Sequence, residues 1–289
     1  LKLTRKYYTE DMPDGRVKHI VQNITDPDIV PYIPDGIGNS TDRQRIPAVL
    51  IIPGGAFRRL VYNFEGEDVA KWLNSMGIAA FVLECRLPSD EHDNAEDVPL
   101  IDAMRAMRVI RGRAQEFGID EAKIGVMGFS AGGFMAALLS TAYESDVYAD
   151  YKYKDEYDKL SARPDFAVCS YPVISIDDCI EAGKRYMSEE QVLERISDGK
   201  AKILHKYNPD KLVRPDMPPV FICETDDDRT TLSENSVGFY MAARKAGVSA
   251  ELHIFRTGGH GYGCGDDFAQ TGEWKVLFTK WIKSIGIIS

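Results

Sequence analysis

No stretch of this sequence stays apolar for the roughly 18 residues that a membrane-spanning helix requires. The longest apolar runs, such as residues 48–52 and 78–83, have the length of β-strands. Basic residues do not cluster either, and 45 acidic against 35 basic side chains give a net charge of −10. Because an acidic surface repels phosphate groups, the sequence predicts neither nucleic acid nor a membrane as a partner.

Cysteine is scarce and unpatterned: five residues, an odd number, with no CxxC spacing. Together with the absence of a recognisable signal peptide, this predicts a reduced, cytoplasmic chain. The chain begins with Leu1 rather than Met, which leaves a trimmed leader open. HExxH motifs and Cys/His clusters are missing, and the acidic run Asp226-Asp227-Asp228 lacks the later glycine and glutamate of a calcium loop. We therefore predict no metal and no cofactor.

The 289 residues alternate short apolar runs with amphipathic stretches. This rhythm predicts one α/β domain over residues 1–289, with a mostly parallel central sheet, helices on both faces and antiparallel pieces near the N-terminus. Two polar stretches, residues 143–161 and 178–207, interrupt the rhythm as candidate caps over a site, or as surface decoration. The predicted strands are residues 17–23, 29–33, 47–52, 78–85, 123–128, 166–174, 219–223 and 250–255, and the predicted helices are residues 65–76, 98–117, 130–143, 233–246 and 272–285.

The sharpest motif is the G-x-S-x-G pentapeptide Gly128-Phe129-Ser130-Ala131-Gly132. It follows a predicted strand and opens a helix rich in small residues, which is the context that a nucleophile elbow requires. The glycines let strand and helix approach closely, and the helix N-terminus supplies partial positive charge. We interpret Ser130 as a nucleophile, which needs a base to activate its hydroxyl.

Among five histidines, only His260 lies in a glycine-rich loop directly after a predicted strand. The sequence places His19, His205 and His253 inside strands or a helix, as structural residues, and His92 in a solvated acidic loop. His260 is therefore the predicted base. Its orienting carboxylate would be one of Asp226, Asp227 and Asp228, since the order serine, aspartate, histidine is that of α/β-hydrolases. The residues alone do not choose among the three.

An anion-binding loop is predicted at Pro53-Gly54-Gly55-Ala56-Phe57, just past an apolar strand and ahead of the elbow. This is the place of the HGGG-type loop of esterases. Its backbone N–H groups, with that of Ala131, could bind the oxyanion of a tetrahedral intermediate. Subtilisin indicates roughly 3–4 kcal/mol for each such donor.

From about residue 47 to 285 the chain resembles the α/β-hydrolase family of bacterial acetyl-ester and carbohydrate esterases, labelled acetyl-xylan esterase, feruloyl-esterase-like or xylanase B-like. The segments that carry the resemblance include Pro53-Gly54-Gly55, Glu65-Gly66-Glu67, the stretch 124–133 around the elbow, Arg163-Pro164-Asp165-Phe166, Tyr171-Pro172-Val173-Ile174 and Gly258-Gly259-His260-Gly261.

The resemblance implies roles for individual residues. Ser130 matches the nucleophile, His260 the base, and Gly55, Ala56 and Ala131 the oxyanion-hole positions. The family's acid stands four residues after a His or Gln, a place that Glu224 takes here, so Asp228 is favoured over Asp227. The chain departs from the pattern with Ala56 for a glycine, Glu224 for the histidine, and Thr231-Leu232 for Val-Pro.

These observations predict a serine esterase that removes short acyl groups, with acetyl favoured, from a sugar or similar alcohol. The substrate would be a small acyl ester, with an acetylated oligosaccharide as one candidate. Phe57, Arg58, Tyr62 and Phe129 flank the elbow and the loop as candidate pocket residues, or as ordinary packing. Alternatives are an amide hydrolase of the arylformamidase or peptidase kind and an inactive binding module. A xylanase would need a carboxylate pair beside a long cleft, which nothing in the sequence places.

Overall fold

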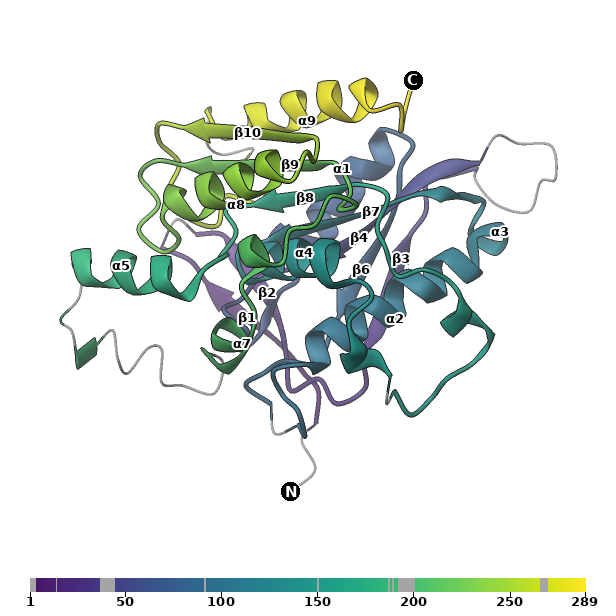
Figure 1. Ribbon diagram of the computed structural model, residues 1–289, viewed down its shortest axis with the longest axis horizontal. Helices are drawn as coiled ribbons and strands as arrows, with labels where there is room; N and C mark the ends of the chain where they lie inside the picture. The colour runs from purple at the N-terminus through teal and green to yellow at the C-terminus, as the bar shows by residue number, and fades with distance from the viewer. Residues whose placement is uncertain are drawn as a thin grey trace.

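A seven-stranded sheet runs through the middle of the molecule in the order β10-β9-β8-β7-β4-β6-β3 (Figure 1). The computed structural model describes residues 4–13, 15–36, 45–90, 92–149, 151–186, 188, 190–191, 201–265 and 270–289. All neighbouring strands are parallel except β3, which pairs antiparallel with β6. The strands are β3 (Asp28–Tyr32), β4 (Ile46–Ile52), β6 (Ala79–Glu84), β7 (Ile119–Phe129), β8 (Ala167–Ser170), β9 (Val220–Thr225) and β10 (Ala250–Phe255).

A second, antiparallel sheet in the order β1-β2-β5 flanks the first. Its strands are β1 (Lys6–Asp11), β2 (Val17–Gln22) and β5 (Leu60–Val61). The short strand β5 directly follows the glycine-rich loop at residues 53–57, and the Val61 N–H donates to the carbonyl oxygen of Gly54 at 2.9 Å. The sequence predicted antiparallel pieces here, but it missed β1 and β5.

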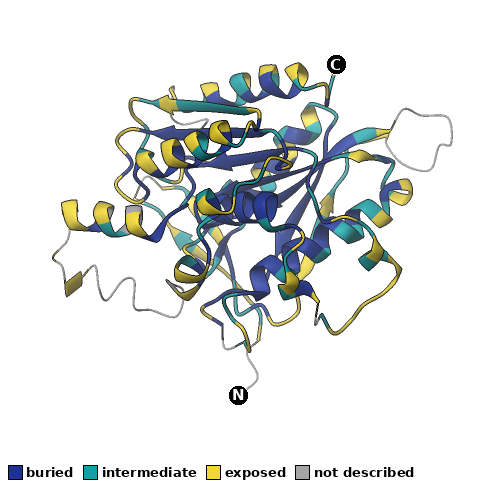
Figure 2. Cartoon of the chain, viewed as in Figure 1, coloured by how far each residue is buried: buried dark blue, intermediate teal, exposed yellow. Residues whose placement is uncertain are grey.

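Helices cover both faces of the large sheet because the central strands are apolar on both sides. In β4, Leu50 and Ile52 enter one buried cluster, while Val49 and Ile51 enter another. The first cluster includes residues of α2 (Val98–Gly112), α4 (Ala131–Ala142) and α8 (Ser233–Lys245), and the second includes residues of α1 (Asp68–Ser75) and α9 (Glu273–Ser284). The inner strands β4, β6, β8 and β9 and the helix α4 are almost wholly buried, whereas the edge strand β10 is only partly buried (Figure 2). The predicted layer arrangement is confirmed, with helices on both faces of a mostly parallel sheet.

Four predicted elements differ from the structure by several residues or contain a break. The strand expected at 123–128 begins earlier, at Ile119. The helix expected at 65–76 starts with a π-helical turn, Asn63–Glu67, which leads into α1. The helix expected at 98–117 breaks at Arg113 into α2 and the short α3 (Ala114–Phe117), which ends at Gly118 in the left-handed conformation. The strand expected at 166–174 stops at Ser170, because Tyr171 takes a φ of 37° and turns the chain.

The stretch 143–161 packs along the outside of α2 through two short 3₁₀ turns, Asp146–Tyr148 and Glu156–Lys159. The Arg105 guanidinium binds the Asp155 carboxylate at 2.5 Å, and the Arg108 guanidinium lies 4.0 Å from the centre of the Tyr148 ring. The segment begins where α4 ends. Because a helix rises about 1.5 Å per residue, the start of the segment lies about 18 Å along α4 from Ser130. Of residues 178–207, the structure describes the end of α5 (Ile176–Tyr186) and α7 (Ala201–Lys206); residues 187, 189 and 192–200 lie outside the described part.

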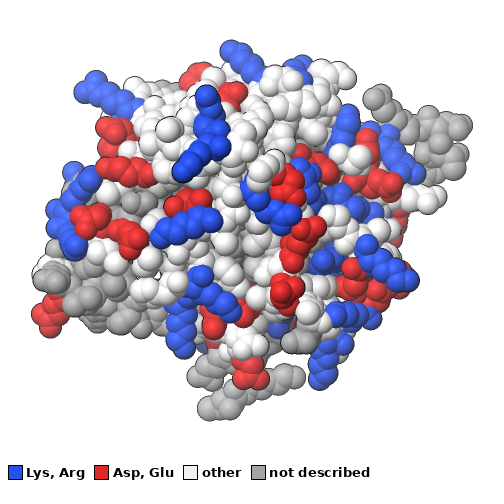
Figure 3. Space-filling view, in the orientation of Figure 1, with Lys and Arg blue, Asp and Glu red and all other residues white. Residues whose placement is uncertain are grey.

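Acidic and basic side chains alternate over the face of the molecule that Figure 3 shows, rather than gathering by sign. In the described ranges, no helix is both long and apolar enough to span a membrane.

Candidate active site

Ser130 occupies a sharp turn between the end of β7 and the start of α4. Its backbone has a φ of 54° and a ψ of −119°, a conformation that is strained for a residue with a side chain. The Ser130 N–H donates to the Ser170 carbonyl oxygen at 3.0 Å, which ties the turn to β8. A Cβ on Gly128 would lie 1.9 Å from the Gly132 carbonyl oxygen, so only glycine fits there. These are the properties of a nucleophile elbow, as the motif predicted.

His260 follows β10 in the loop that the sequence singled out, and its ring reaches the elbow. The Ser130 Oγ lies 2.8 Å from His260 Nε2, and His260 Nδ1 lies 2.6 Å from Asp228 Oδ2. Because the ionised carboxylate only accepts hydrogen bonds, Nδ1 carries the proton and Nε2 is free to accept the serine proton. The three side chains therefore form a continuous line from hydroxyl to carboxylate.

Asp228 is 2% exposed and is fixed by several donors besides the histidine. Its Oδ1 accepts from the backbone N–H groups of Thr230 (2.7 Å) and Thr231 (3.0 Å), and its Oδ2 accepts from the Thr231 hydroxyl (3.0 Å). Burial disfavours the charged carboxylate, but the hydrogen bond from His260, the charge that the imidazole carries once protonated and the two N–H donors outweigh it. The pKa of Asp228 therefore lies below its ordinary value.

The neighbouring residue, Asp227, makes a different contact. The Asp227 carboxylate accepts the Gly259 N–H at 2.8 Å and so holds the backbone just before His260. Geometry thus separates the carboxylates that the residues alone left open, and it places Asp228 against the imidazole.

The glycine-rich loop passes directly over the elbow. A Cβ on Gly54 would lie 2.5 Å from the Phe129 carbonyl oxygen and 2.9 Å from Ser130 Cβ. Gly55 and Ala56 both have positive φ, 138° and 57°. No acceptor in the described part of the chain takes up the N–H groups of Gly55, Ala56 or Ala131. These three donors remain available for an oxyanion next to Ser130.

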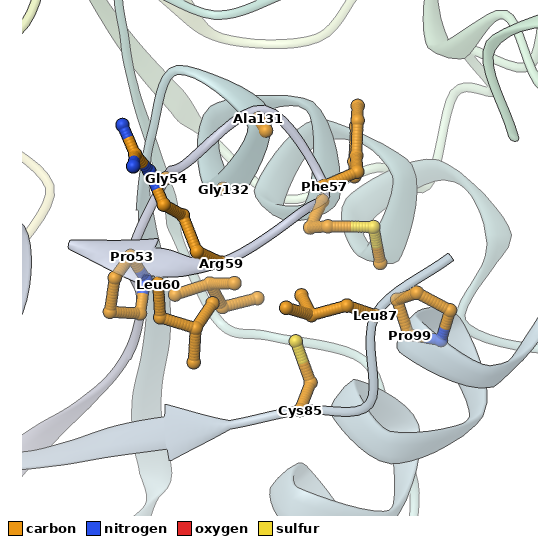
Figure 4. Close-up of a pocket in the computed structure, with 12 residues that line it drawn as sticks. Pro53, Gly54, Phe57, Arg59, Leu60, Cys85, Leu87, Pro99, Ala131 and Gly132 are labelled. Atoms are coloured by element: carbon orange, nitrogen blue, oxygen red, sulfur yellow. The ribbon is translucent and has the colours of Figure 1, made fainter. Parts of the chain in front are cut away.

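A small, mainly apolar cavity lies between this loop and the start of α4 (Figure 4). Its free volume is about 10 Å³, close to that of a single water-sized group. Phe57 is among its lining residues, and the Phe57 ring packs edge-on against Phe134 with the ring centres 5.5 Å apart. The lining residues are Ile52, Pro53, Gly54, Phe57, Arg59, Leu60, Cys85, Leu87, Pro99, Ala131, Gly132 and Met135.

A larger cavity of about 360 Å³ adjoins the loop that follows His260. The loop after His260 lines it with glycines, Tyr262 and Cys264, and the π-helical turn, α1 and the residue before β2 line it with an aromatic ring and charged residues. The lining residues are Arg16, Phe64, Asp68, Lys71, Gly261, Tyr262, Cys264 and Gly265.

The other candidate pocket residues lie in different surroundings. Arg58 is exposed on the loop. The Tyr62 hydroxyl lies 3.2 Å from that of Tyr32. Phe129 is fully buried, and its ring packs against Tyr171 and Trp274, which matches the packing alternative.

The expectation of a solvated His92 was wrong. Its side chain is 13% exposed, and Nε2 lies 3.0 Å from the Ile24 carbonyl oxygen. A carbonyl oxygen can only accept, so this nitrogen donates. A buried carbonyl in need of a donor, which the sequence does not reveal, draws the ring inward.

Sequence reasoning missed two residues beside the site, Glu65 and Tyr171. The Glu65 carboxylate accepts the Gly54 N–H at 2.8 Å and the Tyr171 hydroxyl at 3.0 Å. Both residues lie in segments that carried the family resemblance, but their contacts join positions 106 residues apart. In the described ranges, no group of three or more His, Cys, Asp or Glu side chains could hold a metal ion.

The fold and the elbow define the class: this chain has the α/β-hydrolase fold. The family model BD-FAE matches residues 37–242, well over half of the chain, and the chain belongs to that family. The expected likeness to acetyl-ester and carbohydrate esterases is thereby confirmed.

Two curated relatives are similar over most of this chain. An acetylxylan esterase of Xylanibacter ruminicola is 31% identical over 240 residues, which cover 82% of this chain and 45% of that protein. Endo-1,4-beta-xylanase B of Butyrivibrio fibrisolvens is 29% identical over 269 residues, covering 90% of this chain and 40% of that protein. The chain therefore spans less than half the length of these relatives.

Solved structures give the same class. The acetyl ester-xyloside bifunctional hydrolase of Caldicellulosiruptor lactoaceticus is 38% identical, with a TM-score of 0.73 and coverage of 91% of this chain and 89% of that one. The carboxylesterase Cest-2923 of Lactobacillus plantarum WCFS1 has a TM-score of 0.74 with coverage of 99% of each chain. It is 20% identical, so that likeness bears on the fold alone.

Proposed function

We propose that this chain is a serine carboxylesterase that removes short acyl groups, acetyl above all, from hydroxyls of a sugar or a related alcohol. The observation that carries the proposal is the line from the Ser130 hydroxyl through His260 to the buried Asp228 carboxylate, at 2.8 and 2.6 Å. Beside it lie three N–H groups that no acceptor among the described residues takes up. In acyl transfer, each of these groups has a defined task.

The reaction begins when Ser130 Oγ attacks the ester carbonyl carbon and His260 Nε2 takes the hydroxyl proton. The oxyanion binds the N–H groups of Gly55, Ala56 and Ala131. Asp228 keeps the imidazole in the productive tautomer and stabilises its protonated form. The intermediate collapses, the alcohol leaves with the proton from His260, and the acyl group stays on Ser130. Water, deprotonated by His260, then attacks the acyl-enzyme and releases the acid and the free serine.

The two cavities support the substrate class. The space of about 10 Å³ between the glycine-rich loop and Ala131 suits a methyl group and resists a longer chain. The cavity of about 360 Å³ borders the loop that follows His260, at Gly261 and Tyr262, and Phe64 lines it together with charged side chains. Such a mixture suits the apolar face and the hydroxyls of a sugar. The names of the acetylxylan esterase and the acetyl ester-xyloside hydrolase agree with this choice.

The test is hydrolysis of p-nitrophenyl esters from acetate to octanoate by the wild type and by Ser130→Ala. We expect the rate to peak at acetate and to fall by at least about a thousandfold in the variant, since no other group can replace the nucleophile. Circular dichroism and melting temperature would check that the variant is folded. Residual rates near those of the wild type would refute the mechanism, and a peak at longer esters would refute the acetyl preference.

The sugar part is tested separately, with acetylated xylo-oligosaccharides as substrates. Release of acetate at a higher kcat/KM than from p-nitrophenyl acetate would support a sugar leaving group. If p-nitrophenyl acetate is hydrolysed while acetylated xylo-oligosaccharides are not, the esterase proposal stands and the sugar assignment falls.

A further inference from the structure

Beneath the nucleophile lies a second buried carboxylate that the reaction steps above do not use. Glu65 is 5% exposed and projects from the π-helical turn that precedes α1. Its Oε2 accepts the Gly54 N–H at 2.8 Å, and its Oε1 accepts the Tyr171 hydroxyl at 3.0 Å. A Cβ on Gly54 would lie 2.7 Å from this Oε2 and 2.9 Å from Ser130 Cβ, which puts the carboxylate close under the elbow.

The Tyr171 hydroxyl connects Glu65 to the loop that follows His260. Tyr171 is fully buried, and its hydroxyl oxygen accepts the Gly263 N–H at 3.0 Å. Because that oxygen already accepts from Gly263, its own proton points to Glu65. The hydrogen bonds therefore run in a fixed direction, from Gly263 through Tyr171 to Glu65, with Gly54 donating to the opposite oxygen.

The direction of these hydrogen bonds determines whether a carboxylate or an amide fits at position 65. Both oxygens of Glu65 face donors, so both must accept. Burial raises the pKa of the Glu65 carboxyl above its ordinary value, and the charge of His260 and the donors Tyr171 and Gly54 offset that rise only in part. The geometry, with one donor on each oxygen, matches the ionised form. An amide at this position would turn its NH₂ group toward one of the two donors and lose that bond.

The hydrogen bonds of Glu65 and Tyr171 connect two loops that carry different groups of the site. Gly54 precedes the oxyanion donors Gly55 and Ala56 on the loop after β4, and Gly263 follows His260 on the loop after β10. The Tyr171 ring also packs edge-on against the His260 ring at 5.0 Å. The Thr231 hydroxyl, which donates to Asp228, also lies 3.3 Å from the Tyr171 carbonyl oxygen.

We propose that Glu65 and Tyr171 form a brace that sets the position of the oxyanion loop relative to His260. This inference rests on the proposed serine-esterase function and adds two positioning residues to it. Neither residue contacts the reacting atoms; each acts through the backbone of Gly54 or Gly263. The developing charge is shared by the oxyanion and the imidazolium, so a misplacement of one loop against the other weakens the transition state more than it weakens substrate binding.

The test compares Tyr171→Phe with Tyr143→Phe. Tyr143 is also buried, and its hydroxyl also donates to a carboxylate, Asp216 at 2.7 Å, but it lies beyond the far end of α4. Both changes thus remove one hydroxyl from a tyrosine–carboxylate bond. With p-nitrophenyl acetate we expect Tyr171→Phe to lower kcat about ten- to hundredfold with KM within about twofold of the wild type, and Tyr143→Phe to leave both within about twofold.

Glu65→Gln extends the test to the other end of the brace. It should lower kcat at least as much as Tyr171→Phe, and the double variant should be little worse than Glu65→Gln alone, because one chain of hydrogen bonds is broken in each case. Melting temperatures are measured for every variant, and rates are compared per folded molecule. If Glu65→Gln fails to fold, the tyrosine pair decides alone.

The outcomes separate the brace from the proposed function. A Tyr171→Phe enzyme with a kcat within twofold of the wild type, or with the same loss as Tyr143→Phe, overturns the brace while the esterase function stands. A loss of thermal stability at unchanged kcat would show that the brace only supports the fold, and it also overturns the proposal. A folded wild type without activity on any ester defeats the proposed function itself.

Discussion

The α-carbon of Gly132 rests directly against the carbonyl oxygen of Ile52, the last residue of β4. A Cβ built on Gly132 would approach that oxygen to 1.9 Å and the carbonyl carbon of Pro53 to 2.8 Å. The first turn of α4 and the root of the oxyanion loop are thus in backbone contact. The last glycine of the motif therefore holds the donor Ala131 next to the donors Gly55 and Ala56.

From this contact we predict opposite outcomes for two alanine substitutions. Gly132→Ala should lower the folded yield sharply, or lower the melting temperature and the activity together, because two backbone segments would have to separate. Gly238→Ala should raise stability by about 1 kcal/mol, since Gly238 lies in the middle of α8, is exposed and has nothing within 4 Å of a new Cβ. Thermal melts of both variants check this, and a Gly132→Ala protein as stable as the wild type would contradict it.

The two adjacent aspartates give a second prediction. Asp228→Asn should reduce kcat on p-nitrophenyl acetate by about 10⁴, because an amide facing His260 Nδ1 favours the wrong tautomer. Asp227→Asn should cost less than about tenfold, since the side-chain oxygen of an asparagine can still accept the Gly259 N–H. Steady-state kinetics of the pair are the measurement, and equal losses would show that the choice of Asp228 is wrong.

A third prediction concerns the small cavity. Leu87→Ala removes side-chain atoms from its lining, so we expect the kcat/KM ratio of butyrate to acetate esters to rise about tenfold. Leu100→Ala serves as the control, because Leu100 is equally buried and does not line the cavity. Both variants should lose about 2–5 kcal/mol of stability, so assays are run well below their melting temperatures. An unchanged chain-length profile in Leu87→Ala would mean that the acyl group binds elsewhere.

Glu224 yields a prediction about pH. It is fully buried beside Asp228, and burial together with that negative charge raises its pKa well above the ordinary value. The native state thus keeps a proton that the unfolded chain releases near pH 4.3, so this group costs stability as the pH rises above that value. Glutamine is neutral in both states and removes the cost.

Glu224→Gln should therefore raise the melting temperature by a few degrees at pH 8 and leave it nearly unchanged at pH 4. The amide can still accept the Thr225 N–H, which donates to Glu224 Oε1 at 2.9 Å, and it can still bond with the Ser236 hydroxyl at Oε2. Melting curves of both proteins across this pH range are the check. A variant that is less stable than the wild type at pH 8 would mean that Glu224 is ionised in the folded protein.

Local signals made most of the site predictable. The elbow needs glycines within a few residues of Ser130, and the loop of His260 is itself glycine-rich, so both motifs are visible in short segments. The choice of Asp228 over Asp227 needed the resemblance to a family, because the three aspartates are adjacent and chemically identical. Only the fold distinguishes them, by turning one carboxylate to the imidazole and another to the Gly259 N–H.

What the sequence could not supply depends on distant contacts and on backbone angles. Strand β5 has two residues and no pattern of its own; it forms because β2 offers an edge beside the oxyanion loop. The predicted strand past Ser170 looked continuous, since the positive φ of Tyr171 leaves no trace in composition. The carboxylate of Glu65 meets that tyrosine across 106 positions, which no periodicity can reveal.

The four loops that form the site follow four different strands, β4, β7, β9 and β10, and Ser130 and His260 lie 130 positions apart. Closing so long a separation is slow, because chain entropy is lost before the contacts form. During refolding, hydrolytic activity should therefore return only after β10 has docked on β9, later than the compaction of the central strands. The return of hydrolytic activity during refolding would therefore report when the last step of folding is complete.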